Sequence, residues 1–203
     1  PATNIISGLA VGFECTGLPV LVISAALMGS YWCGKMALGE IAGADVLVED
    51  TRIVAVGKDL SADGARTIDA TGDVVIPGFI DTHSHAGSDV LEMPGALPAV
   101  SQGITTAVVG QDGSSPWPLS DFFQKLEQQP TALNIAAYSG HNTLRDNVMG
   151  KDFRRDANDD EVKAMSGMLE RDMTAGALGL ATGMEYDPGI YSNPSEVLIL
   201  AKV

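Results

Sequence analysis

Basic residues are scarce in this chain, which has 12 Lys and Arg against 26 Asp and Glu and a formal net charge of −14. Such acidity argues against nucleic acid or an anionic membrane surface as the partner of the soluble part. Cysteine is nearly absent, because only Cys15 and Cys33 occur and they form no close pair. No disulfide framework is therefore expected. The 45% hydrophobic and 19% charged residues indicate a globular rather than a disordered chain.

Charge is missing altogether between Glu14 and Lys35. A helix of that length, at about 1.5 Å per residue, approaches the ~30 Å of a bilayer core. The sequence therefore predicts an apolar helix near Leu18 to Tyr31, with membrane association only through residues 14–35. No Lys or Arg precedes this stretch, which argues against a signal peptide.

Histidine is also rare, and two of the three histidines lie close together in the stretch VIPGFIDTHSH, residues 75–85. The apolar part of this stretch predicts a short strand that runs into the histidines. Because side chains at i and i+2 share one face of a strand, Asp81, His83 and His85 are expected on the same side. Two adjacent imidazoles provide half of a zinc-type site. One metal ion touching both rings is therefore expected, and packing in the core or on the surface is the alternative.

Strands and helices alternate after His85. Strands are predicted over residues 104–110, 133–138 and 177–182, and helices near residues 94–102, 120–129 and 159–175. This alternation predicts parallel strands covered by helices. With the strand before His83 it makes about four βα units, whereas a closed (β/α)8 barrel needs eight and roughly 250 residues. Upstream, residues 45–49 and 52–56 have the pattern of a hairpin.

These motifs resemble a known family. VIPGFIDTHSH resembles the first barrel strand of the metal-dependent amidohydrolase superfamily, and three later motifs resemble its N-acyl-D-amino-acid deacylase branch in order and spacing: GITTAVVGQDG, SGHNTLRDNVMG and GALGLATGMEYDPGIYS. The resemblance covers about residues 44–203. It implies an α/β fold, with an incomplete β-sandwich over residues 44–76 and a partial TIM barrel over residues 77–203.

The resemblance also implies an activity. The expected function is a cytoplasmic, Zn²⁺-dependent hydrolase of linear amides, with one or two divalent ions and a small N-acyl amino acid as substrate. A dihydroorotase-like cyclic amidase is an alternative within the superfamily. The general base and two further metal histidines are expected beyond Val203, so no catalytic residue is assigned here and the chain alone is expected to be inactive.

Asp112 departs from the family pattern. The resembled deacylases usually carry a cysteine in this turn, where it bridges the metals, whereas this chain has Gly110-Gln111-Asp112-Gly113. A carboxylate can bridge two divalent ions through its two oxygens, so the resemblance implies metal ligation by His83, His85 and Asp112. The alternative is that Asp112 serves only to form the turn, for which Asp-Gly is well suited.

Three further residues are expected on the substrate side of the site: His141, Arg145 and Tyr186. A fixed guanidinium suits a substrate carboxylate through paired hydrogen bonds. The alternatives are loop packing for His141 and a surface ion pair for Arg145. For Tyr186, which lies in a turn-forming stretch, the expectation comes from the resemblance alone.

The N-terminal residues resemble a different family. Residues 1–32 are similar to a transmembrane stretch of the membrane-bound, ion-pumping pyrophosphatases, but include none of the Asp-rich motifs that bind pyrophosphate. A fragment of such a pump is therefore an alternative identity for residues 1–40. The expectation is that two unrelated pieces join near residues 38–44; the alternative is a family-specific extension with an apolar helix.

Overall fold

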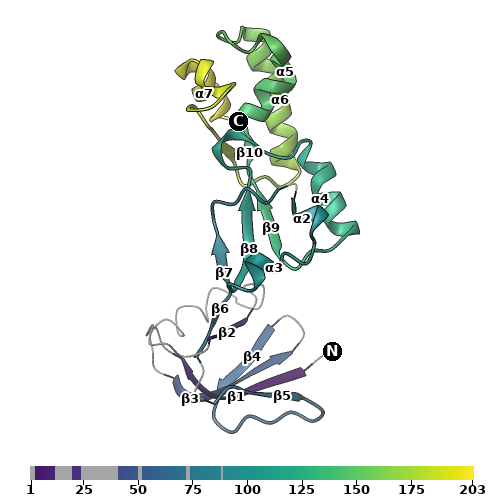
Figure 1. Cartoon of the computed structure of the whole chain (residues 1–203), viewed down its shortest axis with the longest axis vertical. Helices are drawn as coiled ribbons and strands as arrows, with labels where there is room; N and C mark the ends of the chain where they lie inside the picture. The colour runs from purple at the N-terminus through teal and green to yellow at the C-terminus, as the bar shows by residue number, and fades with distance from the viewer. Residues whose placement is uncertain (1–2, 12–19, 24–40, 50–51, 72–73, 88) are drawn as a thin grey trace. The chain divides into compact units, whose positions relative to one another are not determined.

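The computed structural model describes residues 3–11, 20–23, 41–49, 52–71, 74–87 and 89–203 (Figure 1). The chain forms two compact units, Pro1–Phe79 and Ile80–Val203. The predicted division into segments 1–40, 44–76 and 77–203 stays a prediction.

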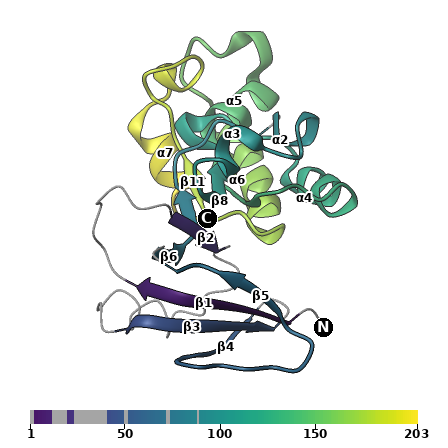
Figure 2. The same ribbon diagram turned by 60° about the horizontal axis from the view of Figure 1, so that its bottom comes forward.

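The first unit contains a four-stranded sheet in the order β4-β3-β1-β5 (Figure 2). Its strands are β1 (Thr3–Val11), β3 (Ile41–Glu49), β4 (Arg52–Gly57) and β5 (Arg66–Asp69). β3 pairs antiparallel with both β1 and β4, which confirms the predicted hairpin, and β5 runs parallel to β1. Ala44, Val46 and Val48 are all buried, since alternate residues of β3 face one side of the sheet.

The predicted apolar helix over Leu18 to Tyr31 is wrong where the structure describes that range. Val20–Ile23 form strand β2, which pairs in parallel with β6 (Val74–Pro77). The other residues of the predicted helix lie outside the described part of the chain. Periodicity does not separate helix from strand in a short apolar run, and the β-branched residues of VLVI fit a strand once a partner strand is present. No helix among the described residues is long and apolar enough to cross a membrane.

The second unit has a three-stranded sheet in the order β7-β8-β9. Its strands are β7 (Phe79–Asp81), which begins at the last residue of the first unit, β8 (Ile104–Val109) and β9 (Asn134–Ala137). β8 and β9 are parallel, and β10 (Ser139–Gly140) pairs in parallel with β11 (Leu180–Ala181). The predicted parallel α/β arrangement is thus confirmed, and the strands in the described ranges do not close a barrel.

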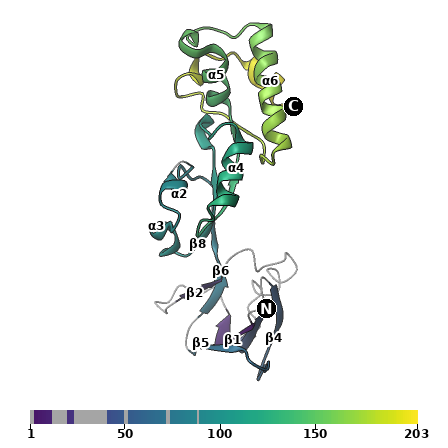
Figure 3. The same cartoon turned by 90° about the vertical axis from the view of Figure 1, so that its right-hand side faces the viewer.

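Helices follow or separate these strands, and α5 lies beside α6 (Figures 1 and 3). The helices are α2 (Asp89–Glu92), α3 (Leu97–Val100), α4 (Leu119–Gln128), α5 (His141–Met149), α6 (Asp159–Thr174) and α7 (Pro194–Leu200), with 3-10 turns η2 (Gln111–Gly113), η3 (Gly150–Asp152) and η4 (Gly189–Tyr191). The helix predicted near residues 94–102 is only the single turn α3. Its N-cap Ala96 has φ of 41°, which prevents the helix from starting earlier.

Helix α6 begins with a capping box. Asn158 Oδ1 accepts the Glu161 N–H at 2.9 Å, and Glu161 Oε2 accepts the Asn158 N–H at 2.8 Å. Five apolar residues recur every three to four positions along α6, and four of them pack with Leu144 of α5 and Leu200 of α7: Val162, Met165, Met168 and Leu169. Met173 is the exception, with 39% of its surface exposed. A second apolar cluster joins β8 and β9 to α4: Val90, Val109, Leu119, Phe122 and Ala137.

Candidate metal centre

His83 and His85 follow strand β7 rather than forming part of it. The strand ends at Asp81, whose Oδ1 accepts the His83 N–H at 3.1 Å. This local bond takes the place of a ladder bond at His83, so the predicted strand ends before the two histidines. The two imidazole rings nevertheless lie 5.3 Å apart between centroids, which confirms their predicted proximity.

Asp112 lies between these two histidines. It follows β8 in turn η2, and its Oδ2 is 3.2 Å from Nε2 of His83 and 3.3 Å from Nε2 of His85. One ligand atom from each of the three residues lies within 4.8 Å of the others. The side chains are 57%, 63% and 37% exposed for His83, His85 and Asp112 respectively, so the cluster is open to small molecules.

This geometry fits a divalent ion. Zinc bonds of about 2.0–2.1 Å at tetrahedral angles separate neighbouring ligand atoms by about 3.3 Å. The two distances from Asp112 Oδ2 to the imidazole nitrogens match that spacing. Two imidazoles and one carboxylate are donors that divalent transition metals accept. The cluster could therefore hold one ion with coordination positions left open.

The backbone at Asp112 is left-handed, with φ of 54°. Aspartate tolerates this conformation better than most residues, and the neighbouring Gly110 and Gly113 also have positive φ, at 88° and 79°. The turn-forming role and the proposed ligand role are therefore compatible at this residue.

Asn142, which the sequence did not single out, holds the Asp112 loop. Its side chain is almost fully buried, and Nδ2 donates to the carbonyl of Gly183 at 3.2 Å and to that of Asp112 at 3.5 Å. A β-carbon on Gly113 would collide with the Asn142 side chain, and one on Gly183 would collide with the Asp112 carbonyl. The glycines after the strands were the available signal for this close approach.

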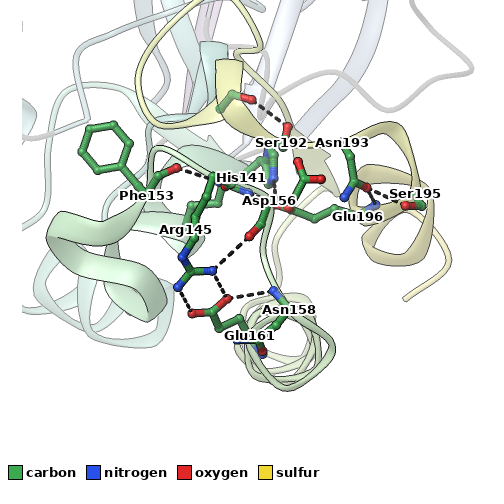
Figure 4. Close-up of polar contacts among 12 residues, drawn as sticks. His141, Arg145, Phe153, Asp156, Asn158, Glu161, Ser192, Asn193, Ser195 and Glu196 are labelled. Atoms are coloured by element: carbon green, nitrogen blue, oxygen red, sulfur yellow. Dashed lines mark hydrogen bonds and ion pairs between the residues drawn. The ribbon is translucent and has the colours of Figure 1, made fainter.

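His141 and Arg145 lie in a buried ion-pair cluster with Glu196 of α7 (Figure 4). Glu196 Oε1 is 2.8 Å from His141 Nε2, and its Oε2 accepts a hydrogen bond from Arg145. Arg145 also donates to the carbonyls of Phe153 at 3.0 Å and Arg155 at 2.9 Å. Side-chain exposure is 0% for His141 and Arg145 and 1% for Glu196, so Arg145 makes no surface ion pair.

The pKa of Glu196 reflects this setting. Burial raises the pKa of the carboxyl, but the hydrogen bonds from His141 and Arg145, together with their charges, outweigh burial and lower it below its ordinary value. Sequence analysis missed Glu196, because an acidic residue in the first turn of a helix normally indicates an exposed side chain.

The three predicted substrate residues thus lie in two different environments, one buried and one exposed. His141 and Arg145 face Glu196, whereas Tyr186 is 53% exposed and its N–H donates to the Gly183 carbonyl at 3.1 Å. Their substrate roles stay predictions. A cavity of about 490 Å³ adjoins the metal cluster and is lined in part by Ser84, His85, Trp117, Phe122 and Lys125.

One similarity concerns a short stretch only. Thirty-four residues, 17% of this chain and 5% of the relative, are 71% identical to the K(+)-insensitive pyrophosphate-energized proton pump 2 of Moorella thermoacetica. The length of this match is close to that of the N-terminal residues that resemble pumping pyrophosphatases.

Solved structures resemble the whole described fold. A D-aminoacylase with a binuclear metal centre superposes with a TM-score of 0.77 at 34% identity, covering 100% of this chain and 43% of that one. An N-acyl-D-glutamate deacylase from Bordetella bronchiseptica, complexed with zinc and a phosphonate inhibitor, gives 0.78 at 29% identity with the same coverage.

Comparison of the sequence with known proteins points to the same group of enzymes as the solved structures. The D-aminoacylase of Alcaligenes xylosoxydans xylosoxydans is 37% identical over 179 residues, which cover 76% of this chain and 37% of that enzyme. The chain therefore spans well under half the length of this curated relative. The model of the Amidohydrolase family matches residues 66–193. The chain belongs to the amidohydrolase family and is related to the D-aminoacylases.

Proposed function

We propose that this chain carries the first metal-binding part of an N-acyl-D-amino-acid deacylase, which hydrolyses a linear amide with Zn²⁺ bound at His83, His85 and Asp112. The observation that carries the proposal is the convergence of these three side chains at one open cluster. Relatives that are about 37% identical and are named D-aminoacylase support the substrate class. The zinc-bound deacylase structure supports the metal.

Each side chain of the metal cluster would have its own role. Nε2 of His83 and Nε2 of His85 would bind the ion, and Oδ2 of Asp112 would bind it between them. The remaining oxygen of Asp112 is available for a second divalent ion. A bound ion supplies Lewis acidity, which polarises an amide carbonyl and acidifies water. The cavity beside His85 would receive the N-acyl amino acid.

The 203-residue chain by itself should not hydrolyse N-acyl-D-amino acids. All three of its histidines are accounted for, two in the metal cluster and His141 in the buried pair with Glu196. The resemblance assigns the general base and two further metal histidines to residues that are not among these 203. Loss of a general base typically costs about two to four orders of magnitude in rate.

Activity of two purified proteins tests the proposal: the chain alone, and the chain joined to the part of D-aminoacylase that follows the matched region. Both are assayed with zinc on a panel of N-acetyl-D-amino acids, with dihydroorotate as a control for cyclic amidase activity. The joined protein should hydrolyse N-acetyl-D-amino acids and lose this on His83→Ala, and the chain alone should not. Failure of a folded, zinc-loaded joined protein on the whole panel would refute the deacylase function.

The N-terminal similarity favours a second origin for residues 1–40 but supports no pumping activity. We retain the proposal that residues 1–40 are foreign to the deacylase, because the pump match is 71% identical over 34 residues. Sequencing the gene across residues 30–50 from genomic DNA tests this. A single continuous reading frame in the source genome would refute it.

A further inference from the structure

We infer that the carboxylate of Asp112 lowers the preference of the metal centre for the thiophilic Cd²⁺ over the harder Mn²⁺, relative to a thiolate at the same position. This inference rests on the metal centre of the proposed function but not on its substrate. Among the described residues, the candidate donors are two imidazole nitrogens and one carboxylate oxygen. Both cysteines of the chain, Cys15 and Cys33, lie outside the described residues.

The position of the carboxylate supports a direct role in binding. A single oxygen, Oδ2, faces both Nε2 atoms at almost equal distances of 3.2 and 3.3 Å. Formation of the turn alone does not require this oxygen to lie between two imidazoles. The loop that carries it is also held from behind, since the buried Asn142 amide donates to the Asp112 carbonyl. This contact restrains the loop that presents the oxygen ligand.

Ligand chemistry then determines the preference. Thiolate ligands favour soft ions, carboxylates suit Mn²⁺ and Mg²⁺, and imidazoles accept most borderline transition metals. Zn²⁺ still binds more tightly than Mn²⁺ at nearly any site of this type, because affinity follows the Irving–Williams order. The quantity that reports on Asp112 is therefore the ratio of Cd²⁺ affinity to Mn²⁺ affinity, rather than either affinity alone.

Two substitutions separate the ligand role from the turn role. Asp112→Asn keeps the size of the side chain and the tolerance for left-handed backbone, but removes the negative charge. Asp112→Cys replaces the hard oxygen with a soft sulfur. All proteins carry Cys15→Ser and Cys33→Ser, so that Asp112→Cys contains the only thiol, and a His83→Ala/His85→Ala protein reports binding elsewhere on this acidic chain.

Dissociation constants for MnCl2 and CdCl2 are measured by titration calorimetry on the full 203-residue chain, with Mn²⁺ binding checked by electron paramagnetic resonance. Asp112→Asn should weaken Mn²⁺ binding by about tenfold or more, and Asp112→Cys should raise the Cd²⁺ to Mn²⁺ affinity ratio by about tenfold or more. Mn²⁺ binding should be lost in the double histidine variant.

Three results would overturn the inference. The Asp112→Asn protein could bind Mn²⁺ as tightly as the parent, or a folded Asp112→Cys protein could keep the parent's ratio of Cd²⁺ to Mn²⁺ affinity. The third result is Mn²⁺ binding that persists in the double histidine variant. If Asp112→Cys does not fold, as judged by circular dichroism, Asp112→Asn alone decides. The expected ratios of Cd²⁺ to Mn²⁺ affinity would support this inference even if the chain joined to the rest of D-aminoacylase had no deacylase activity. That second result would refute the proposed substrate alone.

Discussion

At the scale of single residues, Glu196 is one of two acidic residues in the described part of the chain that are almost fully buried. Its carboxylate is the partner of two buried groups, His141 and the guanidinium of Arg145. Removing one member of a buried ion pair leaves an uncompensated charge, which typically costs about 3–5 kcal/mol. The buried cluster therefore joins α5 to α7 and specifies which helix faces which, because hydrophobic packing alone would not do so.

We expect Glu196→Gln to lower the free energy of unfolding by about 3–5 kcal/mol at pH 7, measured by urea denaturation. Arg154→Gln is the control, because the Arg154–Asp187 contact of 3.8 Å is exposed and should contribute under about 1 kcal/mol. A cost for Glu196→Gln no larger than that of the control would show that the buried cluster is dispensable.

The stability that Glu196 contributes should fall as the pH is lowered. The pKa of Glu196 is lowered in the folded protein, so its carboxylate contributes stability above the unfolded value of about 4.3 and loses that contribution as the pH falls below it. The difference between the parent and Glu196→Gln should therefore shrink as the pH is lowered from 5 towards the folded-state pKa.

At the scale of elements, the loops after β8, β10 and β11 meet in contacts too close for side chains. Gly183, after β11, lies against the carbonyl of Asp112, and Gly140, at the end of β10, lies against the carbonyl of Gly113. Neither neighbour is the flexible end of a side chain, so neither can move aside cheaply. The position of the Asp112 carboxylate therefore depends on a loop about seventy residues further along the chain.

We expect Gly183→Ala to destabilise the chain by about 1–3 kcal/mol through overpacking and to weaken Zn²⁺ binding by displacing the Asp112 loop. Gly167→Ala in α6 is the matched control, because an added β-carbon there meets nothing within 4 Å. That control should stabilise the helix by up to about 1 kcal/mol and leave metal binding unchanged. Calorimetry with Zn²⁺ measures both variants, and equal affinities would contradict the positioning of Asp112 by this loop.

At the scale of the whole molecule, the three candidate ligands belong to one unit and the N-terminal residues to the other. His83, His85 and Asp112 all lie within Ile80–Val203, whereas β1 is an interior strand of the first unit, between β3 and β5. Removing residues 1–38 would leave β5 without its partner strand, and would leave every candidate metal ligand in place.

We expect a chain that starts at residue 39 to bind Zn²⁺ within about twofold of the parent, since it keeps all three candidate ligands and sites without shared partners usually act independently. Its first unit should be less stable, seen as a loss of strand signal in circular dichroism. His83→Ala/His85→Ala in the shortened chain is the control for binding at the cluster. A much weaker affinity would show that the first unit supports the metal centre.

The sequence by itself determined the features that depend on local order. Alternating strand and helix patterns, together with the resemblance to the deacylases, predicted β8, β9, α4 and α6, because periodicity and capping residues act within a few positions of each other. The spacing of His83 and His85 likewise predicted neighbouring imidazoles, although the expected strand ends at Asp81.

Only the tertiary structure decided the features that depend on distant residues. Val20–Ile23 became a strand because β6 lies beside it, a pairing that no local pattern encodes. Glu196 became the buried partner of His141 and Arg145 because α7 returns to α5. The resemblance implied that Asp112 joins the two histidines, and the tertiary structure decided the geometry: its carboxylate lies between the imidazoles because β7 and β8 end side by side.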